Sequence, residues 1–151
     1  MYESKYPIPA LCSDAIILCD GKILLIKRKE EPFKGKWAFP GGHFNEYESA
    51  RDCCIRETKE ETGLDIEDYC PHLPYGDFGG KGRDPRGWVV SLPFVFNVDK
   101  DVMEKPIQAS DDAEDVKWIP IDDILEGVIR LAFDHYKILS QLFHWKKSHW
   151  D

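Results

Sequence analysis

The chain has 151 residues, of which 42% are apolar and 13% aromatic, and its formal net charge is -8. This length and composition predict one compact domain over residues 1–151, with no room for a second. The negative charge argues against a general nucleic-acid binder, which needs a basic surface. No run reaches the roughly 18 apolar residues of a membrane span and residues 1–10 lack the pattern of a secretion signal, so we expect a cytoplasmic protein without membrane contact.

The first recognisable unit is a β-hairpin. Apolar runs at residues 14–19 and 22–28 are separated by the dipeptide Asp20-Gly21, a strong signal for a hairpin turn. Apolar residues follow one another without alternation in both runs, so we expect strands that are buried on both faces. A polar loop at 29–36 follows.

The best-defined helix is predicted over Ser49 to Thr62. Ser49 stands at a capping position with Asp52 three residues on, and Gly63 stands where a helix should end. Short strands are expected at 37–39, 88–96 and 116–119.

The strand at 88–96 contains Pro93, which predicts a sheet edge or a bulge. Asp122 is expected to cap a short helix. Residues at helical spacing then predict a terminal amphipathic helix: Leu131, His135, Ile138, Leu142 and Trp145.

Three glutamates in the helix at 49–62 form the most informative cluster. Glu57, Glu60 and Glu61 are spaced i, i+3 and i+4, so they share one helix face, where like charges repel. A divalent ion bound among them would reverse that penalty, and carboxylate oxygens suit a hard cation such as Mg²⁺. The alternative is an ordinary solvated charged face.

The position of this face favours the metal. Glu57 and Glu61 lie on the same helical arc as Ala50 and the adjacent cysteines, which is the natural inward face. Carboxylates that point inward are costly unless they are paired or bound to a metal. Arg56, four residues before Glu60, is a candidate partner.

Residues 42–64 resemble the catalytic box of Nudix hydrolases, whose pattern is G-x5-E-x7-R-E-U-x-E-E-x-G-U, with U a bulky apolar residue. The matching positions are Gly42, Glu48, Arg56, Glu57, Glu60, Glu61, Gly63 and Leu64. Trp37 and the run at 40–42 also resemble the family's approach to the box. The departures are Asn45 for the usual Glu, Tyr47 for a frequent Gly, and Thr58 for the first U. They leave the expected metal ligands in place and bear on the loop geometry.

This resemblance implies an α/β fold, an α/β/α sandwich with a mixed β-sheet, in which the box forms a loop-helix-loop. It also implies hydrolysis of a nucleoside diphosphate linked to another group, with Mg²⁺ as cofactor and Mn²⁺ as a substitute. Glu57 and Glu61 would be the leading metal ligands, and Glu60 would be a ligand or hold a metal-bound water. The carbonyl of Gly41 would be a further ligand, and Arg56 would orient the glutamates.

Catalysis also needs a base that takes a proton from the attacking water. In several family members this base precedes a Trp-bearing late strand, and here Asp112 lies six residues before Trp118. Asp112 is therefore the first candidate, with Glu60 and Glu61 as alternatives. An acidic surface turn is the purely structural explanation of Asp112.

The segment at 83–87 indicates the substrate. It resembles the RDPRG segment of ADP-ribose pyrophosphatases in this family. Arg83 and Arg86 on a restrained loop could contact a terminal phosphate or ribose, although a charged turn before a strand is the alternative. Trp37 is a candidate for stacking on the base, and His43 for contacting a phosphate.

The favoured reaction is therefore hydrolysis of ADP-ribose to AMP and ribose 5-phosphate. The alternative substrates are NADH, FAD, dinucleoside polyphosphates and oxidised dNTPs. A non-catalytic module that senses nucleotides is a further alternative, but the intact box favours an enzyme. Resemblance to ADP-ribose pyrophosphatases also suggests a homodimer, and the net charge predicts no nucleic-acid partner.

Overall fold

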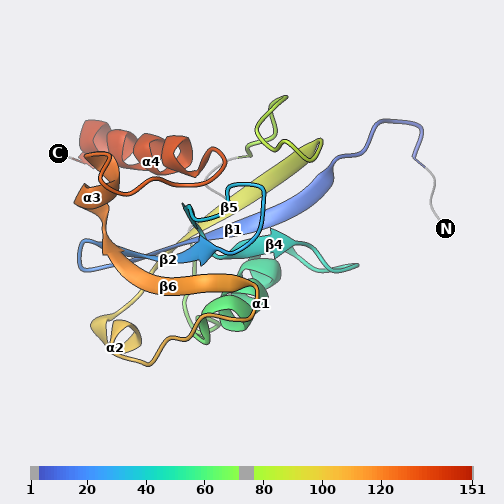
Figure 1. The fold of residues 1–151 in the computed structure, drawn as a ribbon. Helices are drawn as coiled ribbons and strands as arrows, with labels where there is room; N and C mark the ends of the chain where they lie inside the picture. Colours follow the sequence, from blue (N-terminus) through green and yellow to red (C-terminus); the bar gives the residue numbers. More distant parts are fainter. Residues whose placement is uncertain (1–3, 72–76, 151) are drawn as a thin grey trace.

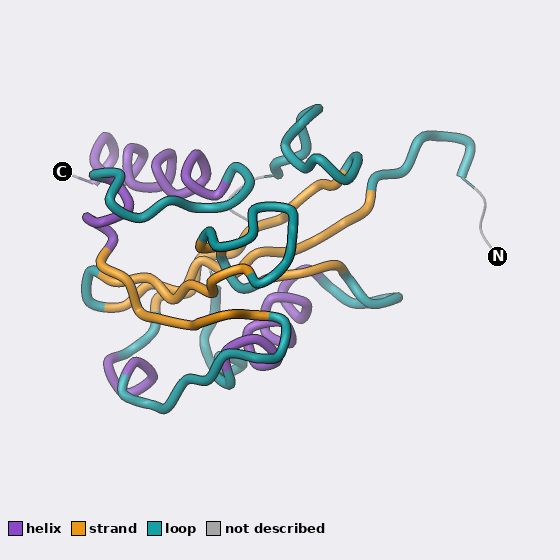
Figure 2. Tube along the Cα trace, viewed as in Figure 1, coloured by secondary structure: helices purple, strands orange, loops and turns teal. Residues whose placement is uncertain are grey.

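The computed structural model describes residues 4–71 and 77–150, which form a mixed β-sheet between helices (Figure 1). The strands are β1 (Ala10–Cys19), β2 (Lys22–Arg28), β3 (Trp37–Ala38), β4 (Gly41–His43), β5 (Val89–Asn97) and β6 (Ala113–Pro120). The helices are α1 (Ala50–Thr62), α2 (Lys100–Met103), α3 (Ile121–Leu125) and α4 (His135–Trp150). Figure 2 shows the loops that connect them. Within the described residues, no helix is both long and apolar enough to cross a membrane.

β1 and β2 form the predicted hairpin, but they separate close to its turn. Asp20 and Gly21 both have positive φ, 51° and 74°, as a tight hairpin turn requires. In the described part of the chain, the two strands pair at Leu18–Ile23 and Cys19–Lys22. Further from the turn, β4 pairs with β1 and β3 pairs with β2, so the chain that follows the hairpin fills the opening between its strands.

Two longer strands complete the sheet. β5 runs parallel to β1, and β6 runs antiparallel to β2. In the described part of the chain, β5 pairs with β1, and its other edge makes an isolated bridge from Ser91 to Phe78, so β5 is an edge strand, one of the two outcomes that Pro93 predicted. The register of β2 and β6 shifts between Lys27 and Arg28, which leaves Glu114 as an extra residue in β6 opposite the end of β2.

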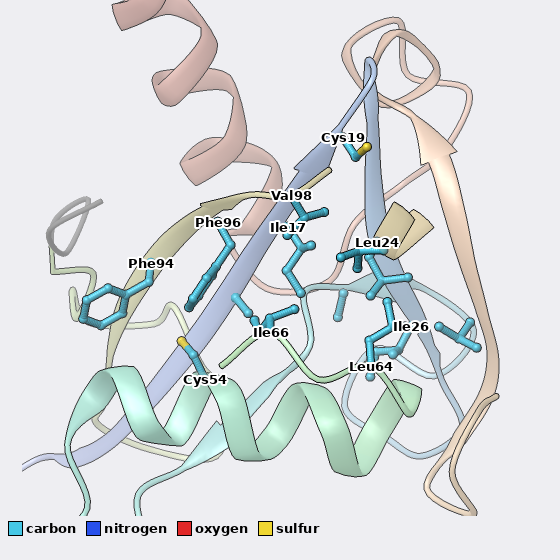
Figure 3. Packing of buried hydrophobic residues seen from close by; sticks show 14 of the residues in the cluster. Ile17, Cys19, Leu24, Ile26, Cys54, Leu64, Ile66, Phe94, Phe96 and Val98 are labelled. Atoms are coloured by element: carbon cyan, nitrogen blue, oxygen red, sulfur yellow. The ribbon is translucent and has the colours of Figure 1, made fainter. Parts of the chain in front are cut away.

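The helices cover both faces of the sheet, with α1 and α2 on one side and α3 and α4 on the other (Figure 1). Successive side chains of a buried strand point to opposite faces. Accordingly, Ala15 and Ile17 of β1 pack into the core beside α1, whereas Ile16 and Leu18 pack into the core beside α3 and α4. Figure 3 shows Cys54 of α1 within the first core. The predicted α/β/α sandwich and the doubly buried strands are therefore confirmed.

Helix α1 begins and ends where its caps predict. The side chain of Ser49 accepts a hydrogen bond from the Asp52 N–H at 3.1 Å. Gly63 ends the helix with φ of 83°, a left-handed conformation that glycine adopts without steric cost. These two caps fix the length of α1 and therefore the position of the glutamates on its last two turns.

Two predictions for the last part of the chain were wrong. Asp122 does not cap α3, because the helix already begins at Ile121, after Pro120, and no side chain caps it. The N–H of Ile121 bonds instead to the Gly21 carbonyl of the hairpin turn. Leu131 precedes α4 and forms a bridge with Trp37, so the terminal helix begins later than its apolar spacing suggested. The side chain of Trp145 lies outside the described residues.

Candidate active site

A pocket opens where β1 and β2 separate, with a cavity volume of about 140 Å³. The hairpin, the β3–β4 segment, α1, the loop before β5 and the start of α4 all contribute to it. The lining residues are Cys12, Asp14, Ile26, Arg28, Ala38, Phe39, Gly41, Gly42, His43, Glu61, Arg83, Asp84, Arg86, Phe133 and His135. The separation of the hairpin strands therefore creates the space for the site.

Helix α1 directs Glu57 and Glu61 toward the glycines of β4. The N–H of Gly41 donates a hydrogen bond to a carboxylate oxygen of Glu61 at 3.0 Å. A side chain at Gly42 would lie 2.6 Å from the carboxyl carbon of Glu57, so only glycine permits this approach. Because the two glutamates are four residues apart, they lie one above the other on the same helix face.

Arg56 holds the neighbouring carboxylates. Its Nε and Nη2 donate to Glu48 at 2.7 and 2.9 Å, and its Nη1 donates to Glu57 at 2.7 Å. The predicted partnership with Glu60 is present at 3.2 Å, but it is longer than the bonds to Glu48 and Glu57. Arg56 also donates to the His43 carbonyl at 3.0 Å, which ties α1 to β4.

The donor chemistry of this cluster fits a hard divalent cation, because its groups are carboxylate oxygens. Among the side chains that the structure describes, in residues 4–71 and 77–143, no three His, Cys, Asp or Glu converge as a ready-made set of ligands. Arg56 donates to both Glu57 and Glu60, while Glu61 binds the Gly41 N–H, so the three carboxylates are divided between two partners.

Burial determines the electrostatics of the cluster. Desolvation raises the pKa of Glu57, and it raises the pKa of Glu61 well above its ordinary value, with the charge of Glu57 adding to the effect. The side-chain hydrogen bonds from Arg56 have the opposite effect on Glu48 and lower its pKa to about 2. The two glutamates that face β4 are therefore unfavourable as anions, and a nearby cation would relieve that cost.

Arg83 and Arg86 both line the pocket, but each is already paired with an aspartate. Arg83 donates from Nε and Nη2 to Asp134 at 2.9 and 2.7 Å, and its side chain is 7% exposed. Arg86 donates from Nε and Nη2 to Asp84 at 3.1 and 2.8 Å. The Arg83 pair joins the loop before β5 to the start of α4, and the Arg86 pair lies within that loop, so both ion pairs stabilise the loop.

The chain matches the family model described as NUDIX domain over residues 12–142. The chain belongs to the NUDIX domain family. Its Nudix box at 42–64 begins in β4, continues through α1 and ends at Leu64, which is the expected loop-helix-loop.

Two relatives are similar along most of this chain. An ADP-ribose pyrophosphatase of Methanocaldococcus jannaschii is 40% identical over 145 residues, which cover 95% of this chain and 78% of that protein. An ADPR responsive transcriptional repressor of Acinetobacter baylyi is 34% identical over 148 residues, which cover 93% of this chain and 56% of that protein. The family and the first relative support a Nudix pyrophosphohydrolase as the class of enzyme.

Solved structures resemble the fold over a similar extent. The NUDIX domain of Shewanella oneidensis NrtR complexed with ADP ribose has a TM-score of 0.79 and 28% identity, covering 95% of this chain and 93% of that chain. A bifunctional NMN adenylyltransferase/ADP ribose pyrophosphatase of Francisella tularensis, complexed with AMP and a Mn ion, has a TM-score of 0.78 and 29% identity. That match covers 94% of this chain and 43% of the other. NrtR is also known in complex with a 27mer DNA, so the absence of a nucleic-acid partner stays a prediction.

The other predicted site residues differ in whether they line the pocket. His43 is exposed and lines the pocket. Trp37 is half-buried in β3, where its ring lies 5.9 Å from the Lys117 ammonium, and it does not line the pocket. Asp112 is exposed in the turn before β6 and also lies outside the pocket lining. Their binding and catalytic roles stay predictions.

A buried polar group that was not predicted from the sequence lies at the pocket. Asp14 of β1 accepts a hydrogen bond from Ser91, and its Oδ2 lies 3.8 Å from Nε2 of His135. The His135 ring stacks on Phe39 with centroids 4.3 Å apart, and its Nδ1 accepts the Phe39 N–H at 3.2 Å. Burial lowers the pKa of His135, so its ring is neutral near pH 7. A charged residue inside a strand expected to be buried on both faces was the signal for Asp14.

Proposed function

We propose that this chain is a divalent-metal-dependent Nudix hydrolase that converts ADP-ribose to AMP and ribose 5-phosphate. The observation that carries the proposal is the composition of the pocket. Glu61 and the β4 glycines form an acidic edge suited to a cation, and arginines in the same pocket suit a phosphorylated substrate. The ADP-ribose pyrophosphatase relative and the ADP-ribose complex of a similar NUDIX domain support this choice of substrate.

Glu57, Glu61 and the carbonyl of Gly41 would hold Mg²⁺, with Glu60 as a further ligand and Mn²⁺ as a substitute. A bound divalent ion withdraws charge from phosphate oxygens and makes a bound water more acidic. Arg56 keeps Glu48 and Glu57 in position through its hydrogen bonds. Asp112 would accept the proton of the attacking water, with Glu60 and Glu61 as the alternative bases.

Three of the substrate contacts proposed from the sequence line the pocket, and Trp37 lies outside its lining. His43 at its rim would contact a phosphate, and Arg83 and Arg86 would contact the phosphate or ribose from the loop before β5. Trp37 would stack on the base only if the substrate extends beyond the lining residues. The ion pairs of both arginines limit how far either can move toward a ligand.

A direct test is to incubate the protein with Mg²⁺ and ADP-ribose and to separate the products. We expect AMP and ribose 5-phosphate in equal amounts, and no turnover in excess EDTA. NADH, FAD, a dinucleoside polyphosphate and an oxidised dNTP should each give a lower kcat/KM. A higher kcat/KM for any of them would replace ADP-ribose as the proposed substrate, and full turnover in EDTA would refute the metal requirement.

The similarity to an ADPR responsive repressor favours a second candidate, in which the chain binds ADP-ribose without hydrolysing it. The same samples distinguish the two functions. Calorimetric binding of ADP-ribose with no AMP formed would support the sensing module, whereas catalytic turnover would exclude it.

A further inference from the structure

Three arginines line the pocket, and they differ in their partners. Arg83 and Arg86 each donate two hydrogen bonds to an aspartate. Among the residues that the structure describes, the side chain of Arg28 makes no ion pair, and its one hydrogen bond runs from Nε to the Pro32 carbonyl at 2.7 Å. This bond fixes the base of the guanidinium and leaves its two terminal nitrogens available to a ligand.

The surroundings of Arg28 hold its side chain in one place. Its Cζ lies 5.0 Å from the ring centroid of Phe133, and the Phe133 ring packs against Phe33 with centroids 4.8 Å apart. Phe133 has φ of 52°, a left-handed conformation that costs free energy for a bulky residue. Strained residues of this kind are concentrated at binding sites, where the strain holds a side chain in position.

A second guanidinium group lies close to Arg28. The Cζ of Arg86 lies 5.5 Å from the same Phe133 ring, so two guanidinium groups share one aromatic side chain. Burial lowers the pKa of Arg28, and the charge of Arg86 lowers it further. An anion bound beside Arg28 would relieve both effects, just as a cation would relieve the buried glutamates.

We propose that Arg28 binds the diphosphate of the substrate, and that Arg83 and Arg86 act chiefly by holding the loop before β5. The inference rests on the proposed function for the identity of the ligand. A planar guanidinium whose terminal nitrogens are unoccupied can donate to two oxygens of a phosphate at once. Glu61 lines the same pocket, so the diphosphate would lie between Arg28 and the acidic edge.

The test compares binding in EDTA of ADP-ribose and of inorganic pyrophosphate, measured by titration calorimetry. The variant is Arg28→Gln, and Lys29→Ala is the matched control, because Lys29 is an exposed neighbouring cation outside the pocket lining. We expect Arg28→Gln to weaken both ligands by about tenfold or more, the loss typical of one charge-assisted contact. Lys29→Ala should bind both as the wild type does.

Arg28→Lys provides a second, milder change, because it keeps the charge but lacks the planar pair of donors. It should bind more weakly than the wild type, and it remains decisive if Arg28→Gln does not fold. With ADP-ribose and Mg²⁺, loss of a uniform binding contact should raise KM more than it lowers kcat.

Wild-type affinity in Arg28→Gln, or in Arg28→Lys if only that variant folds, would overturn the assignment. An equal loss in Lys29→Ala would also overturn it, because the effect would then reflect overall charge. Failure of the wild type to bind either ligand would also overturn the assignment of Arg28. A wild type that binds ADP-ribose without turnover, and that loses binding in Arg28→Gln, would refute the proposed hydrolysis and support the role of Arg28.

Discussion

The carboxylate of Glu61 lies in the pocket and accepts a hydrogen bond from the Gly41 N–H, and burial raises its pKa. In Glu61→Gln the side chain keeps its size and its hydrogen-bond acceptor but loses its charge. Hydrolysis should fall by at least about a hundredfold, because the metal loses a charged ligand. In EDTA the variant should be as stable as the wild type or more stable, because a desolvated like charge is removed.

Thermal unfolding of both proteins with EDTA and with Mg²⁺ measures these effects. Mg²⁺ should raise the Tm less in the variant, since a ligand stabilises the folded state only through its affinity for that state. Glu67→Gln, at an exposed position outside the pocket lining, is the matched control and should respond to Mg²⁺ as the wild type does. A destabilised variant with near-normal activity would show that Glu61 is a structural residue.

Glu48 should make stability depend on pH. Its pKa of about 2 in the folded protein lies below the ordinary value of 4.5, so its bonds to Arg56 stabilise the fold above pH 4.5. That stabilisation should disappear as the pH falls through 2. Urea unfolding of the wild type and Glu48→Gln should differ by about 1 kcal/mol or more near neutral pH, with the difference shrinking between pH 4.5 and 2. A difference that does not change with pH would contradict this assignment.

For single residues, the spacing of the Nudix box predicted that Glu57 and Glu61 would share one helix face, because four residues complete about one helix turn. The apolar residues on that face predicted that it points inward. The sequence did not predict Asp14, Ser91 and His135, which come from three distant segments and meet only when β5 and α4 pack on β1. The sequence also did not indicate Arg28 as a ligand-binding residue. That role depends on the ion pairs that the other two pocket arginines make with aspartates.

Among the secondary-structure elements, the approach of β4 to α1 controls the acidic edge. In Gly42→Ala the new methyl group would meet the flexible end of Glu57, so the glutamate should move while the fold remains. Mg²⁺ affinity and turnover should each fall about tenfold or more, with little change in Tm. Gly80→Ala is the control, because a side chain there meets no atom within 4 Å. Loss of Tm with normal Mg²⁺ affinity would show that the contact is only structural.

The sequence predicted those elements whose signals are local. The Asp20-Gly21 turn, the Ser49 cap and the Gly63 terminator each depend on a few neighbouring residues, and all three are present. Asp122 and Leu131 were assigned wrongly because distant contacts decide their positions. The hairpin turn binds the start of α3, and Trp37 pairs with Leu131 before α4 begins.

At the scale of the whole molecule, the ion pair of Arg83 with Asp134 joins the loop before β5 to the start of α4. Both side chains are mostly buried, so Asp134→Asn would leave Arg83 without its charged partner. Removing one member of a buried pair typically costs about 3 kcal/mol of unfolding free energy. Denaturant unfolding should show this loss, whereas Asp122→Asn, at an exposed site, should stay near wild type. An equally small effect in both variants would show that the pair contributes little.

The separation of β1 and β2 also bears on the order of folding. The segments that fill the opening, β3 and β4, follow the hairpin directly, so one wall of the pocket depends on contacts between residues close in the chain. The polar group at Asp14 requires Ser91 and His135, whose contacts close much longer loops. Local contacts generally form faster than distant ones. The packing of β3 and β4 against the hairpin should therefore form before Asp14 meets Ser91 and His135, so the β4 glycines would reach their final positions before the pocket is complete.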